Sequence, residues 1–169
     1  MTLLADDSLE KALWALLEEV KDPEMPPVSL VEMGMIHQVS IADGIVAVEV
    51  LPTFVGCPAL KLMKKSISEK LSELEQVREI RVNFVFDPPW TSDRISDAGR
   101  EKLRSFGIAP PPKSHKPGEM WEVNCPYCGS PYTKMENLFG PAACRSILYC
   151  PKCKNPFEAF KPIAVSGSN

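Results

Sequence analysis

The chain has 169 residues, 44% of them hydrophobic, which is enough for one medium domain or two small ones with at least one buried core. Its formal net charge of −3, from 19 basic and 22 acidic residues, provides no positive field for a nucleic-acid backbone. The longest apolar runs, such as residues 45–50, fall far short of the roughly 20 residues that cross a bilayer, and no export signal is recognised. We therefore expect a globular cytoplasmic protein that binds neither nucleic acid nor membrane, with its six cysteines reduced or metal-bound.

The first predicted element is an amphipathic helix over residues 8–20. Asp7 and Glu10 resemble a capping pair at its start, and Asp22-Pro23 is expected to stop it. The helix is predicted from apolar residues that recur at helical spacing, namely Leu9, Ala12, Leu13, Leu16, Leu17 and Val20.

Two strands, a second helix and a third strand are predicted next. Residues 38–51 (QVSIADGIVAVEVL) favour a β-hairpin, because Asp43-Gly44 separates two β-branched runs. A helix is expected from Pro58, which suits a first helical position, to about Leu74. Residues 79–86 alternate as a strand with Ile80, Val82, Phe84 and Phe86 on one face. This order predicts a small two-layer α+β domain with helices on one face of a sheet.

The second half of the chain changes character at its prolines. A short helix is predicted within residues 93–105, with Gly107 at its C-terminal turn, and the prolines of residues 110–118 indicate a linker. The predicted domains are residues 1–92 for the α+β domain, 93–118 for the helix and linker, 119–163 for a zinc ribbon and 164–169 for a disordered tail.

Two C-x-x-C pairs carry the clearest chemistry. Cys125 and Cys128 form the first pair, and Cys150 and Cys153 follow after 21 intervening residues, slightly more than the usual spacing. Four thiolates match a tetrahedral zinc site, which would replace a hydrophobic core in a small ribbon. A closed four-cysteine site leaves no open position for a reaction, so a structural role is favoured.

Cys144 is a fifth cysteine near the second pair. Iron-sulfur clusters are also held by four cysteines, so an extra thiol six residues before Cys150 leaves a cluster open. The alternative is that Cys144 is a small buried apolar side chain of the ribbon.

The sixth cysteine, Cys57, lies in a Gly-Cys-Pro turn at the predicted start of the second helix. Unpaired amides and the helix dipole there are expected to lower the pKa of its thiol, with Lys61 and Lys64 adding positive potential. Such a thiol could bind metal or react, but a buried structural cysteine is equally compatible with these residues. Asp22 and Glu24 either belong to a rigid turn or present carboxylates beside Cys57.

Several motifs together resemble a known family. They are DPEMPPVSLVEMGMI, PTFVGCPAL, WTSDRISDAGREKLRSFGIAPP and, near the C-terminus, CPYCGS, FGPAAC and CPKCKNPFEAFK. In this order they resemble the PaaD family, the D subunits of phenylacetyl-CoA epoxidase systems. The first two motifs also resemble the wider family of iron-sulfur assembly-factor domains. Pro141-Ala142 and Arg94 depart from the family pattern, which leaves the substrate of the associated oxygenase open.

The resemblance implies an accessory maturation factor that is not itself an enzyme. It implies that Cys57, Asp22, Glu24 and Cys144 handle iron or an iron-sulfur cluster transiently, and that Cys125, Cys128, Cys150 and Cys153 hold zinc. The implied partners are the oxygenase or reductase subunits of an epoxidase complex, and a homodimer is allowed. The alternative is a non-catalytic zinc-ribbon adaptor that scaffolds a protein complex.

Overall fold

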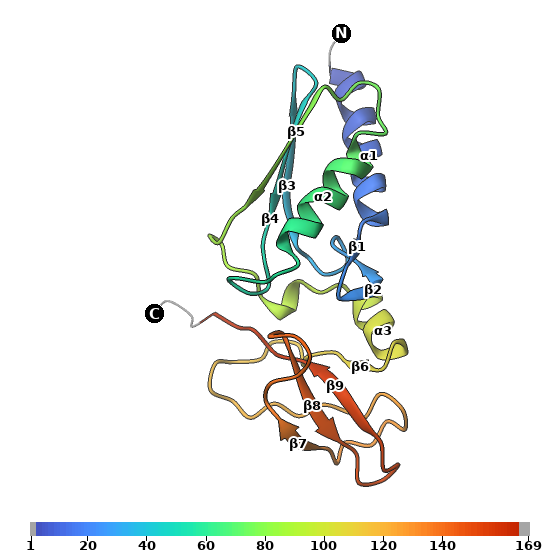
Figure 1. Cartoon of the computed structure of the whole chain (residues 1–169), viewed down its shortest axis with the longest axis vertical. Helices are drawn as coiled ribbons and strands as arrows, with labels where there is room; N and C mark the ends of the chain where they lie inside the picture. Colours follow the sequence, from blue (N-terminus) through green and yellow to red (C-terminus); the bar gives the residue numbers. More distant parts are fainter. Residues whose placement is uncertain (1–2, 166–169) are drawn as a thin grey trace. The chain divides into compact units, whose positions relative to one another are not determined.

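The computed structural model describes the backbone of residues 3–165 and the side chains of residues 8–165. It divides into two compact units, Met1–Pro89 and Trp90–Asn169 (Figure 1). The predicted linker residues 93–118 fall within the second unit, and residues 166–169 of the predicted tail lie outside the described residues. None of the helices in the described part of the chain is long and apolar enough to cross a membrane.

The first unit opens with helix α1, Leu3–Glu19. The predicted stripe is confirmed, because Leu13, Leu17 and Val20 are buried and the stripe's other members are half-buried. The predicted capping pair is wrong, since the helix begins at least four residues before Asp7 and includes Glu10. Leucine and alanine at its start are good helix formers, so the helix continues beyond the candidate cap.

A small hairpin follows where the sequence predicted only a turn. Strand β1, Lys21–Asp22, pairs antiparallel with β2, Met25–Ser29. The buried Asp22 carboxylate accepts hydrogen bonds from the backbone N–H of Glu24 at 2.8 Å and of Met25 at 3.2 Å. This side chain therefore holds the tight turn between the two strands, as aspartate does in Asx turns.

The predicted β-hairpin is confirmed as β3, Ile36–Ala42, and β4, Ile45–Val50. The turn residues Asp43 and Gly44 have φ angles of 49° and 76°. Two successive positive φ angles are characteristic of the type I′ turn, whose twist matches that of the paired strands.

Helix α2, Leu60–Leu71, and strand β5, Glu79–Phe84, complete the first unit. The helix begins two residues after the predicted Pro58 and ends before Leu74, but its predicted apolar face is buried through Met63, Ile67 and Leu71. β5 pairs parallel with β4, and Phe86, predicted to belong to this strand, is exposed beyond its end. α1 and α2 lie on one face of the sheet β3-β4-β5, as the two-layer prediction required (Figure 1).

The second unit begins with a 3₁₀ turn η1, Ser92–Arg94, and helix α3, Asp97–Ser105. The Ser96 hydroxyl accepts a hydrogen bond from the Gly99 N–H at 3.0 Å, which caps the helix, and Gly107 follows it with φ of 89°. Strand β6, Ile108–Ala109, lies inside the predicted linker, whereas residues 110–118 form neither helix nor strand.

A four-stranded sheet in the order β6-β9-β8-β7 forms the rest of this unit. Its remaining strands are β7, Lys134–Asn137, β8, Arg145–Tyr149, and β9, Pro156–Phe160. The predicted strands correspond to β7 and β8, while β6 and β9 were not predicted. The small core of the sheet consists of Ala109, Val123, Cys125, Leu148, Cys150, Phe157 and Ala159.

Candidate metal centre and thiol site

The two C-x-x-C pairs come together at one point. The sulfur atoms of Cys125 and Cys153 are 3.6 Å apart, as are those of Cys128 and Cys150, and all four lie within 4.8 Å of one another. A tetrahedral metal with bonds of about 2.3 Å to sulfur requires sulfur–sulfur distances of about 3.8 Å. The four cysteines therefore fit a tetrahedral metal ion without rearrangement.

Both pairs sit in turns with the same backbone hydrogen bonds. The N–H of Gly129 donates to the Cys125 carbonyl at 2.9 Å, and the N–H of Lys154 donates to the Cys150 carbonyl at 2.8 Å. Gly129 and Lys154 are also alike in their positive φ angles, 71° and 63°. The two turns are thus copies of one local structure, which explains why the same short motif occurs twice.

Backbone amides stabilise negative charge on these sulfurs. Hydrogen bonds to backbone N–H groups, that of Cys153 foremost, lower the pKa of Cys150. The side chain and then the backbone of Asn155 lower the pKa of Cys153 to about 6. Burial instead raises the pKa of Cys125 to about 11. Asn155 was not predicted to belong to the site, and its position two residues after a C-x-x-C pair is the only sequence signal for it.

Cys144 does not join the four. Its side chain is buried, with 5% exposure, and the group of clustered metal ligands does not contain it. Its backbone carbonyl accepts a hydrogen bond from the N–H of Lys161 at 2.8 Å, which ties the start of β8 to the end of β9. The described contacts give Cys144 a packing position in the ribbon, and its role in handling iron stays a prediction.

Cys57 lies in the connection between β4 and α2, with its side chain half-buried. The backbone N–H groups of Ala59 and Leu60 interact with its sulfur, which places the thiol at the start of the helix as predicted. Gly56 precedes it with φ of 81°, and a side chain there would meet no atom within 4 Å. The positive φ is the reason for glycine at this position.

The electrostatics of Cys57 correct the sequence prediction. Burial raises the pKa of its thiol, and the two backbone amides only partly offset this effect. The negative charges of Glu24 and Asp22 raise the pKa further, so the thiol is protonated over a wider pH range than an ordinary cysteine. The expected lowering by the helix start is present but is outweighed.

Asp22 and Glu24 are therefore near enough to Cys57 for their charges to affect it. The β1-β2 hairpin that carries them lies at the end of the sheet where β4 leads into α2 (Figure 1). Among the residues with described side chains, however, the clustered ligands that could hold a metal ion are the four ribbon cysteines alone. Cys57 and the two carboxylates thus form a neighbourhood rather than a ready-made metal site.

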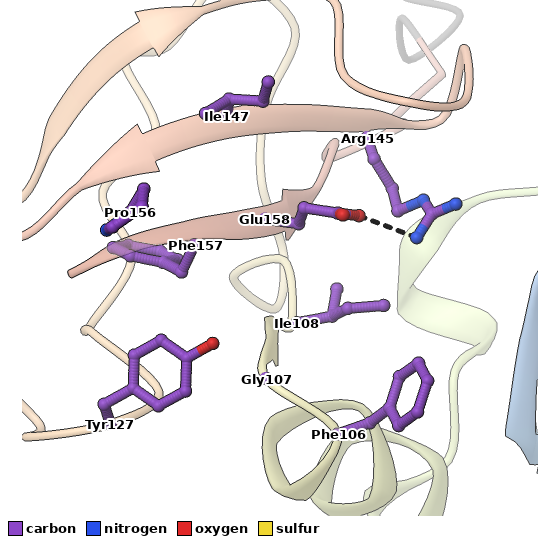
Figure 2. A pocket seen from close by; sticks show the side chains of 9 residues that line it. All are labelled: Phe106, Gly107, Ile108, Tyr127, Arg145, Ile147, Pro156, Phe157 and Glu158. Atoms are coloured by element: carbon purple, nitrogen blue, oxygen red, sulfur yellow. Dashed lines mark hydrogen bonds and ion pairs between the residues drawn. The ribbon is translucent and has the colours of Figure 1, made fainter.

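A cavity of about 340 Å³ lies on the ribbon, lined by strands β6, β8 and β9 and by aromatic side chains (Figure 2). Arg145 donates a hydrogen bond to a carboxylate oxygen of Glu158 at 2.6 Å across its wall. The sequence shows both charges but could not pair them, because their contact depends on how β8 and β9 align.

The comparisons with known proteins divide along the same two units. The model of the PaaD zinc β-ribbon domain matches residues 109–161, and that of the iron-sulfur cluster assembly protein family matches residues 10–84. An Escherichia coli K12 protein, whose name gives it as the D subunit of a "Putative 1,2-phenylacetyl-CoA epoxidase", is 35% identical over 89% of this chain and 92% of its own length. The chain belongs to the PaaD family.

Other relatives resemble the N-terminal part of this PaaD-family chain. The Bacillus subtilis "Fe-S protein maturation auxiliary factor YitW" is 30% identical over 54% of this chain and 89% of its own length. A crystal structure of a DUF59 domain from Bacillus anthracis has 29% identity and a TM-score of 0.57, covering 60% of this chain and 97% of that one. The fold prediction of an α+β domain followed by a four-cysteine zinc ribbon is confirmed.

Proposed function

We propose that this PaaD-family protein is an accessory factor that helps to assemble iron or iron-sulfur centres of a multicomponent oxygenase of the phenylacetyl-CoA epoxidase type. The observation that carries the proposal is the combination of an assembly-factor domain, matched over residues 10–84, with a PaaD zinc ribbon in one chain. The relatives named for iron-sulfur maturation support the first part, and the relative named as an epoxidase component supports the second.

In this proposal the four ribbon cysteines hold zinc, which supplies a fixed tetrahedral crosslink between the two turns. The sulfur of each first cysteine receives backbone N–H groups, which disperse the charge of a bound thiolate. Because a four-thiolate site is closed, the ribbon shapes the protein and presents a surface rather than reacting.

Cys57 is the residue that would hold iron or a cluster as transient cargo. Its half-exposed sulfur is reachable, and binding of iron would release the thiol proton that the nearby carboxylates retain. A thiol that is protonated when empty binds iron reversibly, because protons compete for the sulfur. Glu24 and Asp22 would then offer oxygen atoms or accept the released proton. Cys144 is a further candidate for cargo handling only if the ribbon opens, since its side chain is buried.

The test is complementation of a strain that lacks the gene, with iron and sulfide measured in the purified oxygenase and reductase subunits. Wild type should restore both metal content and activity, whereas Cys57→Ser should fail while remaining folded. Full restoration by Cys57→Ser would remove the thiol from the mechanism. Replacing Cys144 by serine in parallel decides whether that residue contributes.

A second candidate is a zinc-ribbon adaptor that scaffolds the complex without handling cargo. The packed thiol-only site of the ribbon favours it, because this site needs no other metal. Anaerobic purification followed by elemental analysis separates the two: iron and sulfide above trace levels support maturation, and zinc alone at one ion per chain supports the adaptor.

A further inference from the structure

An exposed patch surrounds Cys57 on the outside of the first unit. Its apolar members come from the β4–α2 connection and the first turn of α2. Phe54 is 38% exposed, Val55 is 80% exposed and Leu62 is 50% exposed. Three lysines complete what we call the thiol-side patch, which consists of Phe54, Val55, Lys61, Leu62, Lys64 and Lys65. Large apolar side chains exposed together beside charged ones are typical of a protein interaction site.

The lysines are placed against the stability of their own helix. Lys61, Lys64 and Lys65 lie within the first six residues of α2, whose first turn has no acidic residue. The start of a helix carries partial positive charge, which favours acidic side chains there. The chain as a whole has a net charge of −3, so this basic cluster is a local feature.

Contacts within the chain do not account for these charges. Lys65 forms one exposed ion pair with Glu69 at 3.6 Å, a type of contact that contributes little to stability. Within residues 8–165, Lys61 and Lys64 form no ion pair. The two carboxylates nearest to Cys57 are less accessible, since Asp22 is buried and Glu24 is half-buried. Positive charge therefore dominates the accessible rim of the patch.

We propose that the thiol-side patch docks an acidic surface of a partner protein, with an apolar side chain of the partner packed against Phe54 and Val55. This inference rests on the proposed function: the partner is the protein that receives iron or a cluster from Cys57. Apolar contacts at the centre of such an interface supply most of the affinity, and charges at its rim steer the approach of the partner. Docking at this patch brings the acceptor next to the thiol.

The test uses the full chain and the purified oxygenase and reductase subunits, with binding measured at low and high salt. The double variant Lys61→Glu/Lys64→Glu should lower the affinity for one subunit by about tenfold or more and weaken its salt dependence. The matched control, Lys11→Glu/Lys21→Glu, makes the same charge change at exposed positions elsewhere in the first unit and should stay within about twofold of wild type. Val55→Asp tests the apolar centre in the same assay.

The outcomes separate this inference from the proposed function. Cys57→Ser should bind the subunit normally yet fail to restore its metal. If the two charge-reversal variants bind equally well, or if the wild-type chain binds no subunit, the docking inference is wrong even where Cys57 proves essential. Binding of random-sequence duplex DNA that Lys61→Glu/Lys64→Glu abolishes, without binding of any subunit, would assign the lysines to nucleic acid and also overturn it.

Discussion

At the scale of single residues, Cys57 shows how a local motif and its surroundings can act in opposite directions. The amides at the start of α2 favour the thiolate, but burial and the carboxylates of Glu24 and Asp22 favour the thiol and prevail. A cysteine that carries cargo transiently benefits from this balance, because it does not hold a permanent charge in the absence of metal.

The balance at Cys57 can be tested by removing one carboxylate. Glu24→Gln should lower the pKa of Cys57, so alkylation of this thiol by iodoacetamide should become faster at a fixed pH below the pKa, and the pH profile should move to lower pH. Peptide mass spectrometry follows Cys57 separately from the other cysteines. Glu75→Gln, at an exposed position in the same unit, is the control and should leave the profile unchanged. An unchanged profile in both variants would place Glu24 too far from the sulfur to matter.

Gly140 is a second residue whose identity has a structural cause. A side chain there would place its Cβ 2.9 Å from the backbone oxygen of Arg145, while the N–H of Gly140 donates to that oxygen at 2.8 Å. The glycine of the Phe-Gly-x-x-x-Cys element is therefore required by a close backbone approach.

We expect Gly140→Ala to lower the free energy of unfolding of the second unit by about 1–3 kcal/mol, because backbone must move to accept the methyl group. Thermal denaturation of the zinc-loaded chain measures this loss. Gly118→Ala provides a comparison in the same unit: its φ is also positive, but open space surrounds it, so strain alone of about 1 kcal/mol is expected. Equal losses would show that the contact with Arg145 is unimportant.

At the scale of elements, neighbouring strands of the ribbon are joined by an ion pair as well as by their ladder. Arg145 on β8 and Glu158 on β9 have side-chain exposures of 12% and 32%, so their contact is shielded from water (Figure 2). The Nε atom of Arg145 is buried without a hydrogen-bond partner, which leaves Glu158 as the main compensation for the buried charge.

Glu158→Ala should therefore destabilise the second unit by about 1–3 kcal/mol, since it leaves the Arg145 charge without its partner. Adding Arg145→Leu to this variant should recover part of the loss, because an apolar side chain needs no compensation. Chemical denaturation of the four members of this double-mutant cycle provides the measurement, with Glu136→Ala on the exposed strand β7 as the control. Additive effects would mean that the two side chains do not interact.

At the scale of the whole molecule, the two units depend on different sources of stability. The first unit has a core of apolar side chains between two helices and a three-stranded sheet. The core of the ribbon is small and includes Cys125 and Cys150 themselves. A metal ion would supply the missing stabilisation, as it does in other small domains of this kind.

Removal of metal should consequently unfold the ribbon selectively. After treatment with a strong zinc chelator, hydrogen exchange should become fast in β7, β8 and β9 and stay slow in β3, β4 and β5. Readdition of zinc should restore protection. Chelation that leaves the ribbon protected would show that its fold does not need a metal, and loss of protection in both units would show that they are energetically coupled.

The sequence by itself determined those features that depend on neighbours along the chain. The apolar stripes of α1 and α2, the Asp43-Gly44 turn and the two C-x-x-C turns were all predicted, because periodicity and turn chemistry act over a few residues. Only the tertiary structure decided the parallel pairing of β5, the inclusion of β6 and β9 in the ribbon sheet, the raised pKa of Cys57 and the contact of Arg145 with Glu158. Each of these depends on burial or on partners distant in the chain, which local spacing cannot specify.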